Sequence, residues 1–329
     1  MQVIDMHTHF FPRELPDLAG KHGTNGWPRI ESTSATTSTI YIDNRHFRDI
    51  THECWDVGAR LENMDVQGIE LQVICSTPVL HQYTRPAEHA IDIAKLTNDL
   101  ALEIVARGQG RLAALCQVPL QDIDIASKEL TRCMEAGHKG VQIGNHVGEE
   151  NLDSDEMITF FSHCAAEGAA VLIHPWDVLG RNRMAKHMTM YSVGMPAETH
   201  LTISSMILGG VFDAVPENFR VCFAHGGGSF PGTVGRLDQV WYYGPDGKGK
   251  ASKPPSAYVN RFSVDSMVFD PRVLEFVVQI MGEDQVMLGS DYPFSIGEKS
   301  IGHTVREAAI SDVAKQKILT DNAKRFLNI

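Results

Sequence analysis

The sequence lacks the features that mark several large classes of protein. No stretch of its 329 residues approaches the roughly 20 consecutive apolar residues that a membrane-spanning helix needs. The net charge of −12 leaves no excess of basic residues, so nucleic acid is not expected as a partner. No basic flank followed by an apolar segment begins the chain, so we predict no signal peptide and expect a cytoplasmic location.

Cysteine is scarce and is not arranged for metal binding. The six cysteines are scattered without any C-x-x-C spacing, and several lie inside apolar runs such as LQVICS and FRVCFAH. Closely spaced pairs are typical of zinc or redox sites, whereas single cysteines in apolar runs usually remain free and buried. We therefore expect buried free thiols.

Short β-rich segments alternate with longer helical patterns along the chain. The predicted strands cover residues 2–5, 71–76, 112–118, 140–144, 169–174, 220–225, 262–266 and 285–291. Eight strand–helix units are typical of a (β/α)8 barrel. The G-x-G-x-x-G loop of the dinucleotide-binding alternative is absent after the first strand. We predict an α/β fold, a single TIM-barrel domain over residues 1–329.

One region interrupts this alternation. Residues from about 13 to 50 contain turn-forming and Ser/Thr-rich segments, GTNGWP and ESTSATTSTIYID among them. Such composition indicates short strands joined by turns. We expect a small inserted subdomain or lid after the first barrel strand.

Side chains that bind metals and protons recur at the predicted strand ends. His7 and His9 follow the first strand, and alternation along a strand would point both to the same side. His174, His225 and Asp291 follow the fifth, sixth and eighth strands. The carboxyl ends of barrel strands form the active-site mouth, so we expect these five side chains to meet there.

Two or three imidazoles with one carboxylate are suitable ligands for zinc or a similar divalent ion. We predict that His7, His9 and His174 provide nitrogen ligands. Asp291 is expected to bind the ion and also to accept a proton from its water, which the ion acidifies. His225 precedes a run of glycines, and we predict that it is the catalytic acid–base group rather than a further ligand.

This arrangement resembles the amidohydrolase superfamily. Its binuclear members add a lysine or glutamate at the end of strand 4, where this chain has GVQIGNHVG, so one metal ion is expected. Further motifs extend along nearly the whole chain: DMHTHFFP, VPLQD, LIHPWD, MPAETHL, FAHGGGSFPGTVGR, PPSAYVNRF and VMLGSDYPF. Together they are similar to the 2-amino-3-carboxymuconate-6-semialdehyde decarboxylase family.

The resemblance implies a zinc-dependent carboxy-lyase of aromatic catabolism that decarboxylates its substrate without oxidation. His7, His9, His174 and Asp291 match the zinc ligands of the family, and His225 matches its acid–base residue. No organic cofactor is implied, because the conjugated substrate can act as its own electron sink.

The resemblance also implies a clamp for a small dicarboxylate substrate. Arg48 matches one arginine of the family and Arg236 matches the other, which reaches in from the neighbouring subunit, so a homodimer is expected. The planar guanidinium pairs with a carboxylate through two parallel hydrogen bonds. Tyr191, Trp176 and Phe294 are the predicted pocket-lining residues.

Two positions near the substrate depart from the family pattern. Asn44 stands where a lysine is common, and Tyr191 stands where a tryptophan is common. These differences leave the exact substrate open. The role of Asp177 is also open, between a partner of a ligand histidine and a loop or helix cap.

Other activities are compatible with the same residues. A related hydroxybenzoate decarboxylase and a hydrolase of a lactone or cyclic amide would use the same metal centre. A zinc-dependent sensor without catalysis is a further alternative, although binding alone would not require both His225 and Asp291. Release of carbon dioxide without net addition of water distinguishes decarboxylases from the hydrolase.

Overall fold

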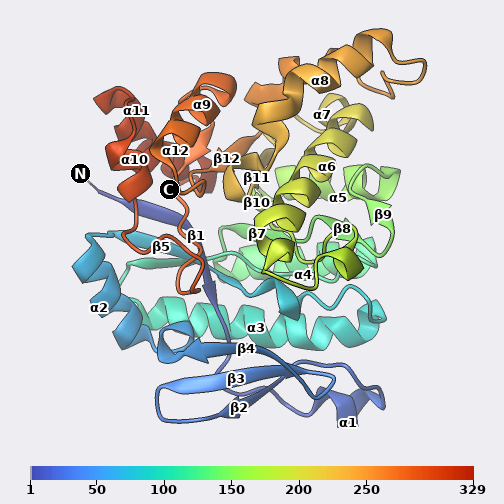
Figure 1. Cartoon of the computed structure of the whole chain (residues 1–329). Coiled ribbons are helices and arrows are strands. Elements are labelled where there is room, and N and C mark those ends of the chain that lie inside the picture. Colours follow the sequence, from blue (N-terminus) through green and yellow to red (C-terminus); the bar gives the residue numbers. More distant parts are fainter. Residues whose placement is uncertain (1) are drawn as a thin grey trace.

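The computed structural model describes residues 2–329, and parallel strands lie at its centre (Figure 1). These strands are β1 (Ile4–Phe10), β5 (Leu71–Ser76), β6 (Leu112–Ala114), β7 (Gly140–Ile143), β10 (Ala170–Ile173), β11 (Arg220–Phe223), β12 (Ser263–Asp265) and β13 (Val286–Met287). All overlap the predicted segments. The strands therefore follow the predicted order along the chain.

The parallel strands close into a barrel. Five pair in the order β13-β12-β11-β10-β7, and three pair in the order β1-β5-β6. Single parallel bridges join the two sets, between Cys116 and Val141 on one side and between Thr8 and Tyr292 on the other. The predicted TIM barrel is confirmed.

The first strand differs most from its prediction. We predicted strand for residues 2–5, whereas β1 continues to Phe10. The extension has a physical cause, because β1 is paired on both edges. It lies parallel to β5, and on its other edge the His9 amide lies 2.7 Å from the Tyr292 carbonyl. His7 and His9 consequently lie within the strand rather than after it.

Helices surround the barrel. The longer ones are α2 (Val57–Gln67), α3 (Ala87–Arg107), α4 (Ile123–Ala136), α5 (Asp155–Ala166), α6 (Met195–Leu208), α8 (Phe230–Tyr243) and α9 (Pro271–Met281). The shorter ones are α7 (Val211–Ala214), α10 (His303–Glu307), α11 (Asp312–Gln316) and α12 (Asn322–Leu327). Asp56, Asp122 and Ser154 cap the N-termini of α2, α4 and α5 by accepting backbone hydrogen bonds. Within residues 2–329, no helix is long and apolar enough to cross a membrane.

The barrel strands bury apolar side chains on both faces. Inward-facing residues such as Met6, Val73 and Leu172 form one core cluster, and a larger cluster lies between strands and helices. This two-sided burial explains the continuous apolar runs in the strand sequences. All six cysteines are buried and free, as expected.

Between β1 and α2 in the sequence, the chain forms an antiparallel sheet, which lies at the bottom of Figure 1. It consists of β2 (Arg29–Ser32), β3 (Thr37–Ile42) and β4 (Arg45–Thr51), and α1 (Leu18–His22) precedes it. Trp27, Ile40 and Ile50 form a small core there together with Phe294 from the barrel side. The sheet thus packs against the segment that follows Asp291.

Candidate metal centre and active-site cavity

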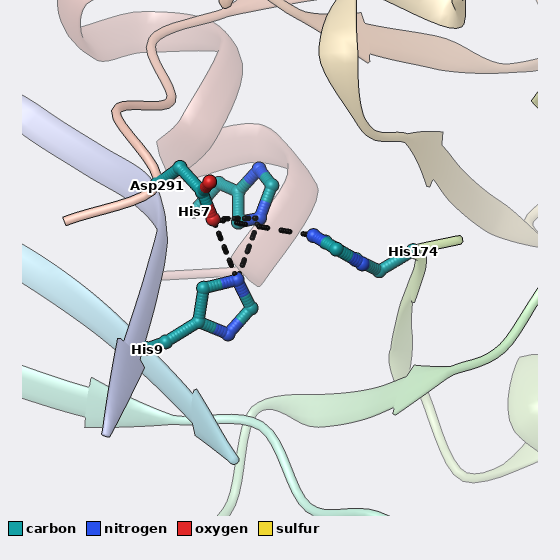
Figure 2. A group of neighbouring side chains, drawn as sticks. All are labelled: His7, His9, His174 and Asp291. Atoms are coloured by element: carbon teal, nitrogen blue, oxygen red, sulfur yellow. Dashed lines mark hydrogen bonds and ion pairs between the residues drawn. The ribbon is translucent and has the colours of Figure 1, made fainter. Parts of the chain in front are cut away.

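Four predicted metal ligands converge at one point (Figure 2). His7 and His9 come from β1, His174 follows β10, and Asp291 follows β13. Their ligand atoms all lie within 4.8 Å of one another. The His9 Nε2 atom lies 2.9 Å from Asp291 Oδ1 and 3.1 Å from His7 Nε2. The closed barrel thus brings residues 284 positions apart in the sequence, His7 and Asp291, to one site.

Hydrogen bonds at the outer ring nitrogens orient two of these histidines. His7 Nδ1 lies 2.7 Å from Asp265 Oδ2, and His174 Nδ1 lies 2.8 Å from the Pro175 carbonyl oxygen. Both oxygens accept, so each Nδ1 carries a proton and leaves an Nε2 lone pair directed into the cluster. His174 Nε2 is buried and has no hydrogen-bond partner among the described residues. This donor set fits a divalent ion.

Burial and neighbouring charges shift the pKa values in the cluster. Burial lowers the pKa of His9 and lowers that of His174 further, with neighbouring histidines adding to the effect on His174. Burial alone would raise the pKa of Asp291, but His9 and the other imidazoles lower it to about 2. The carboxylate is therefore ionised, and His9 and His174 are neutral, as metal ligation requires.

His7 has a different electrostatic environment. Burial opposes protonation, but the hydrogen bond and charge of Asp265 outweigh it and raise the pKa of His7. Burial likewise opposes ionisation of Asp265, and His7 outweighs it, so the pKa of this carboxyl group is lowered. A divalent cation at Nε2 would take the place of the second proton on His7.

His225 lies beside the cluster without joining it. Its ring centroid is 4.9 Å from that of His174 and 5.6 Å from that of His7. The side chain is partly exposed and lines the cavity, and burial lowers its pKa. Both His225 and Asp291 have positive φ angles, of 59° and 58°. Such angles are uncommon for residues other than glycine and often occur at functional sites.

A cavity of about 1020 Å³ borders the cluster. His9, His174, His225 and Asp291 lie on its wall, together with four of the predicted substrate-binding residues, Arg48, Trp176, Tyr191 and Phe294. The Arg48 guanidinium donates to the Tyr191 hydroxyl at 2.9 Å and lies 4.4 Å from the Phe294 ring centroid. The Phe294 ring is in turn 5.3 Å from that of His9. Arg48 is thus held close to the metal cluster.

The fifth predicted substrate-binding residue, Arg236, lies outside the cavity. Arg236 is exposed on α8 and does not line the cavity of its own chain. Asn44 is exposed in the turn between β3 and β4. Asp177 does line the cavity, but its carboxylate pairs with Arg181 at 2.7 Å rather than with a ligand histidine.

Sequence reasoning missed Asp265, which holds His7. Its other oxygen accepts hydrogen bonds from the backbone amides of Gly226 and Met267, at 2.9 and 3.1 Å. Asp265 therefore connects His7, a candidate metal ligand, to the backbone beside His225. A signal was available, because this carboxylate also falls at the end of a predicted barrel strand, 262–266.

Comparison with known proteins agrees with this geometry. The family model described as Amidohydrolase matches residues 4–329. The chain belongs to the amidohydrolase family. A 2-amino-3-carboxymuconate-6-semialdehyde decarboxylase from Dictyostelium discoideum is 39% identical, over 99% of this chain and 91% of the relative. The family predicted from the sequence motifs is confirmed.

Several solved structures share the fold of this chain, and their sequences are distant from it. The Metarhizium anisopliae IDCase in apo form has a TM-score of 0.84 at 22% identity, with 99% of this chain and 97% of that chain covered. A 5-carboxyvanillate decarboxylase from Novosphingobium aromaticivorans, a mutant with bound manganese, has a TM-score of 0.81 at 22% identity, with 100% and 97% covered. These structures support the barrel fold.

Proposed function

We propose that the protein is a metal-dependent, non-oxidative decarboxylase that acts on 2-amino-3-carboxymuconate 6-semialdehyde or a close carboxymuconate analogue. The observation that carries the proposal is the cluster of His7, His9, His174 and Asp291, open to a cavity in which Arg48 is held nearby. The relative from Dictyostelium discoideum, named for this activity, matches 99% of the chain and supports the choice of substrate.

The proposed metal is one zinc ion per subunit. Three imidazole nitrogens and one carboxylate oxygen suit the tetrahedral preference of zinc, whereas manganese favours more oxygen ligands. Manganese is the alternative, because a decarboxylase of related fold contains it. When bound, the ion would acidify a water ligand and stabilise negative charge on the substrate.

The residues beside the metal cluster have separate proposed roles. Decarboxylation replaces a carboxylate on carbon by a proton, so a group must move a proton at that carbon. His225 faces the cavity next to the cluster and is the proposed acid–base group. Arg48 is proposed to pair with a substrate carboxylate, with Tyr191 and Phe294 holding its guanidinium and Trp176 forming part of the wall.

We also propose that the working unit is a cytoplasmic homodimer. Arg236 is exposed and lies outside the cavity of its own chain, so it can act on substrate only in the cavity of a second copy. Six buried free thiols are compatible with a reducing compartment.

Metal removal tests the proposed function. We expect elemental analysis to find about one zinc ion per chain, as the one four-ligand cluster found among residues 2–329 implies. Dialysis against a chelator should abolish the spectrophotometric decay of the carboxymuconate semialdehyde, and added zinc should restore it. Carbon dioxide should form in an amount equal to the substrate consumed.

His225→Asn provides the matched control, since it removes the proposed proton carrier but no metal ligand. We expect roughly 100-fold or greater loss of kcat with unchanged zinc content. Turnover that survives complete metal removal, or full activity of His225→Asn, would contradict the proposal. Opening of a lactone without carbon dioxide release would favour the hydrolase instead.

A further inference from the structure

The cations on the cavity wall differ in whether a carboxylate pairs with them, and among residues 2–329 three arginines, Arg45, Arg48 and Arg85, have no such partner. Arg181 pairs with Asp177 at 2.7 Å, and His46 pairs with Asp49 at 3.0 Å. Arg85 also lines the cavity, yet among residues 2–329 no carboxylate lies within 4.0 Å of its guanidinium nitrogens. A cation of this kind in a protein of net charge −12 is available to an anion from outside the chain.

The Arg85 guanidinium is held in place. It lies 4.9 Å from the ring centroid of Trp27, whose side chain is only 5% exposed. The Arg85 Nε atom is buried and has no hydrogen-bond partner in the described chain. Gln121 fixes the backbone of the same loop by donating to the carbonyl oxygens of Arg85 and Gln82, at 2.7 and 3.3 Å. Binding an anion would therefore order little that is not ordered already.

The Arg85 guanidinium occupies space that a side chain at position 26 would fill. A Cβ atom at Gly26 would lie 2.4 Å from Arg85 Nη2, and the residue has a φ angle of 87°. Any larger side chain would displace the guanidinium from the cavity wall. The absence of a side chain at position 26 thus keeps the cation open to the cavity.

The surroundings of Arg85 include one competing acid. Asp43 Oδ1 would lie 3.0 Å from the same Gly26 Cβ position, so this carboxylate is close to Arg85 without forming an ion pair.

A helix N-terminus also lies near Arg85 in the sequence. The 21-residue helix α3 begins two positions after Arg85, and its N-terminus adds a positive electrostatic contribution.

We propose that Arg85, seated on Trp27, is a second carboxylate-binding position in the cavity. It binds the substrate carboxylate that the reaction retains, while Arg48 and the metal cluster act at the carboxylate that leaves. The planar guanidinium would form a two-point pair with that carboxylate. This inference rests on the proposed function in one respect, namely that the substrate is a dicarboxylate. It assigns a specificity role to a residue of the chain itself, whatever Arg236 of a second copy contributes.

A binding measurement tests the proposal without requiring turnover. The probes are muconate and sorbate, two six-carbon dienoates. Muconate has a carboxylate at each end, whereas sorbate has a carboxylate at one end and a methyl group at the other. Isothermal titration of the zinc-loaded protein should show about tenfold tighter binding of muconate, the effect of one good ion pair. In Arg85→Gln this preference should fall markedly even though Arg48 and Arg236 remain, and in Arg85→Lys it should fall to an intermediate value.

Two further variants sharpen the experiment. Arg181→Gln removes a cavity cation that Asp177 already neutralises, so the preference for muconate should remain. Asp43→Asn removes the competing carboxylate while preserving a turn residue that tolerates positive φ, so the preference should increase. Circular dichroism of each variant confirms its folding.

The outcomes separate this inference from the proposed function. A preference for muconate that is undiminished in Arg85→Gln, or that is absent from the unmodified protein, would overturn the assignment of Arg85. An intact preference that depends on Arg85, together with no turnover of the semialdehyde, would support the carboxylate position and refute the proposed substrate.

Discussion

At the scale of single residues, Asp265 determines how His7 can bind a metal. Its Oδ2 atom accepts from His7 Nδ1, while its Oδ1 atom accepts from the backbone amides of Gly226 and Met267. Both oxygens act as acceptors, which only a carboxylate provides. The acid therefore holds the His7 ring with its proton on Nδ1 and its lone pair on Nε2.

Asp265→Asn tests this role. The asparagine oxygen can still accept from the backbone, but its amide group would then face His7 Nδ1 and favour the tautomer with the proton on Nε2. We expect metal affinity to fall roughly 10- to 100-fold, measured by competition with a chromogenic chelator. Asp177→Asn, which alters a carboxylate paired with Arg181, should leave metal affinity unchanged. Equal affinity in both variants would show that Asp265 does not orient the ligand.

At the scale of secondary-structure elements, Arg60 joins α2 to β1, the strand that contains the two proposed metal ligands His7 and His9. This arginine is 2% exposed, and its Nη2 atom lies 2.5 Å from the His9 carbonyl oxygen. Its Nη1 atom donates to Gln72 on β5 at 3.0 Å. The guanidinium also lies 4.9 Å from the ring centroid of Tyr292, the residue after Asp291. The buried Arg60 side chain thus contacts the segments on both edges of β1.

Arg60→Met should destabilise this part of the barrel. Methionine fills much of the volume but leaves buried acceptors without donors, at a cost of about 1–3 kcal/mol for each. We expect the free energy of unfolding in urea to fall by roughly 3 kcal/mol. Arg107→Met, at the exposed end of α3, should change it by less than about 0.5 kcal/mol. Similar losses in the two variants would argue against the role assigned to Arg60.

At the scale of the whole molecule, the proposed role of Arg236, which is exposed on α8, would connect substrate binding with assembly. A dimer in which each subunit completes the cavity of the other has two equivalent sites. Loss of Arg48 from one subunit and of Arg236 from the other would then disable the same site. The opposite site would retain both arginines.

Mixing of two inactive variants tests this arrangement. Arg48→Ala and Arg236→Ala should each be nearly inactive alone. When unfolded together and refolded, half of the dimers are hybrids and each hybrid has one complete site, so activity should return to about a quarter of the unmodified level. No recovery, despite hybrid dimers detected by native mass spectrometry, would show that Arg236 does not act across an interface.

The sequence by itself determined the barrel and the convergence of four candidate metal ligands. Parallel strands place their carboxyl ends at one edge, so the positions of His7, His9, His174 and Asp291 along the chain were sufficient to predict that they meet. The motif resemblance led to Arg48, Tyr191 and Phe294, which the structure brings to one wall of the cavity.

Only the tertiary structure decided which groups support that site. Asp265 contacts His7 because β12 and β1 lie near one another across the closed barrel, at a sequence separation of 258 residues. Arg85 faces the cavity because Gly26 leaves space and Trp27 provides a surface, both from the antiparallel sheet region. Such contacts depend on how side chains from distant segments pack together, and the local periodicity of the sequence contains no information about this packing.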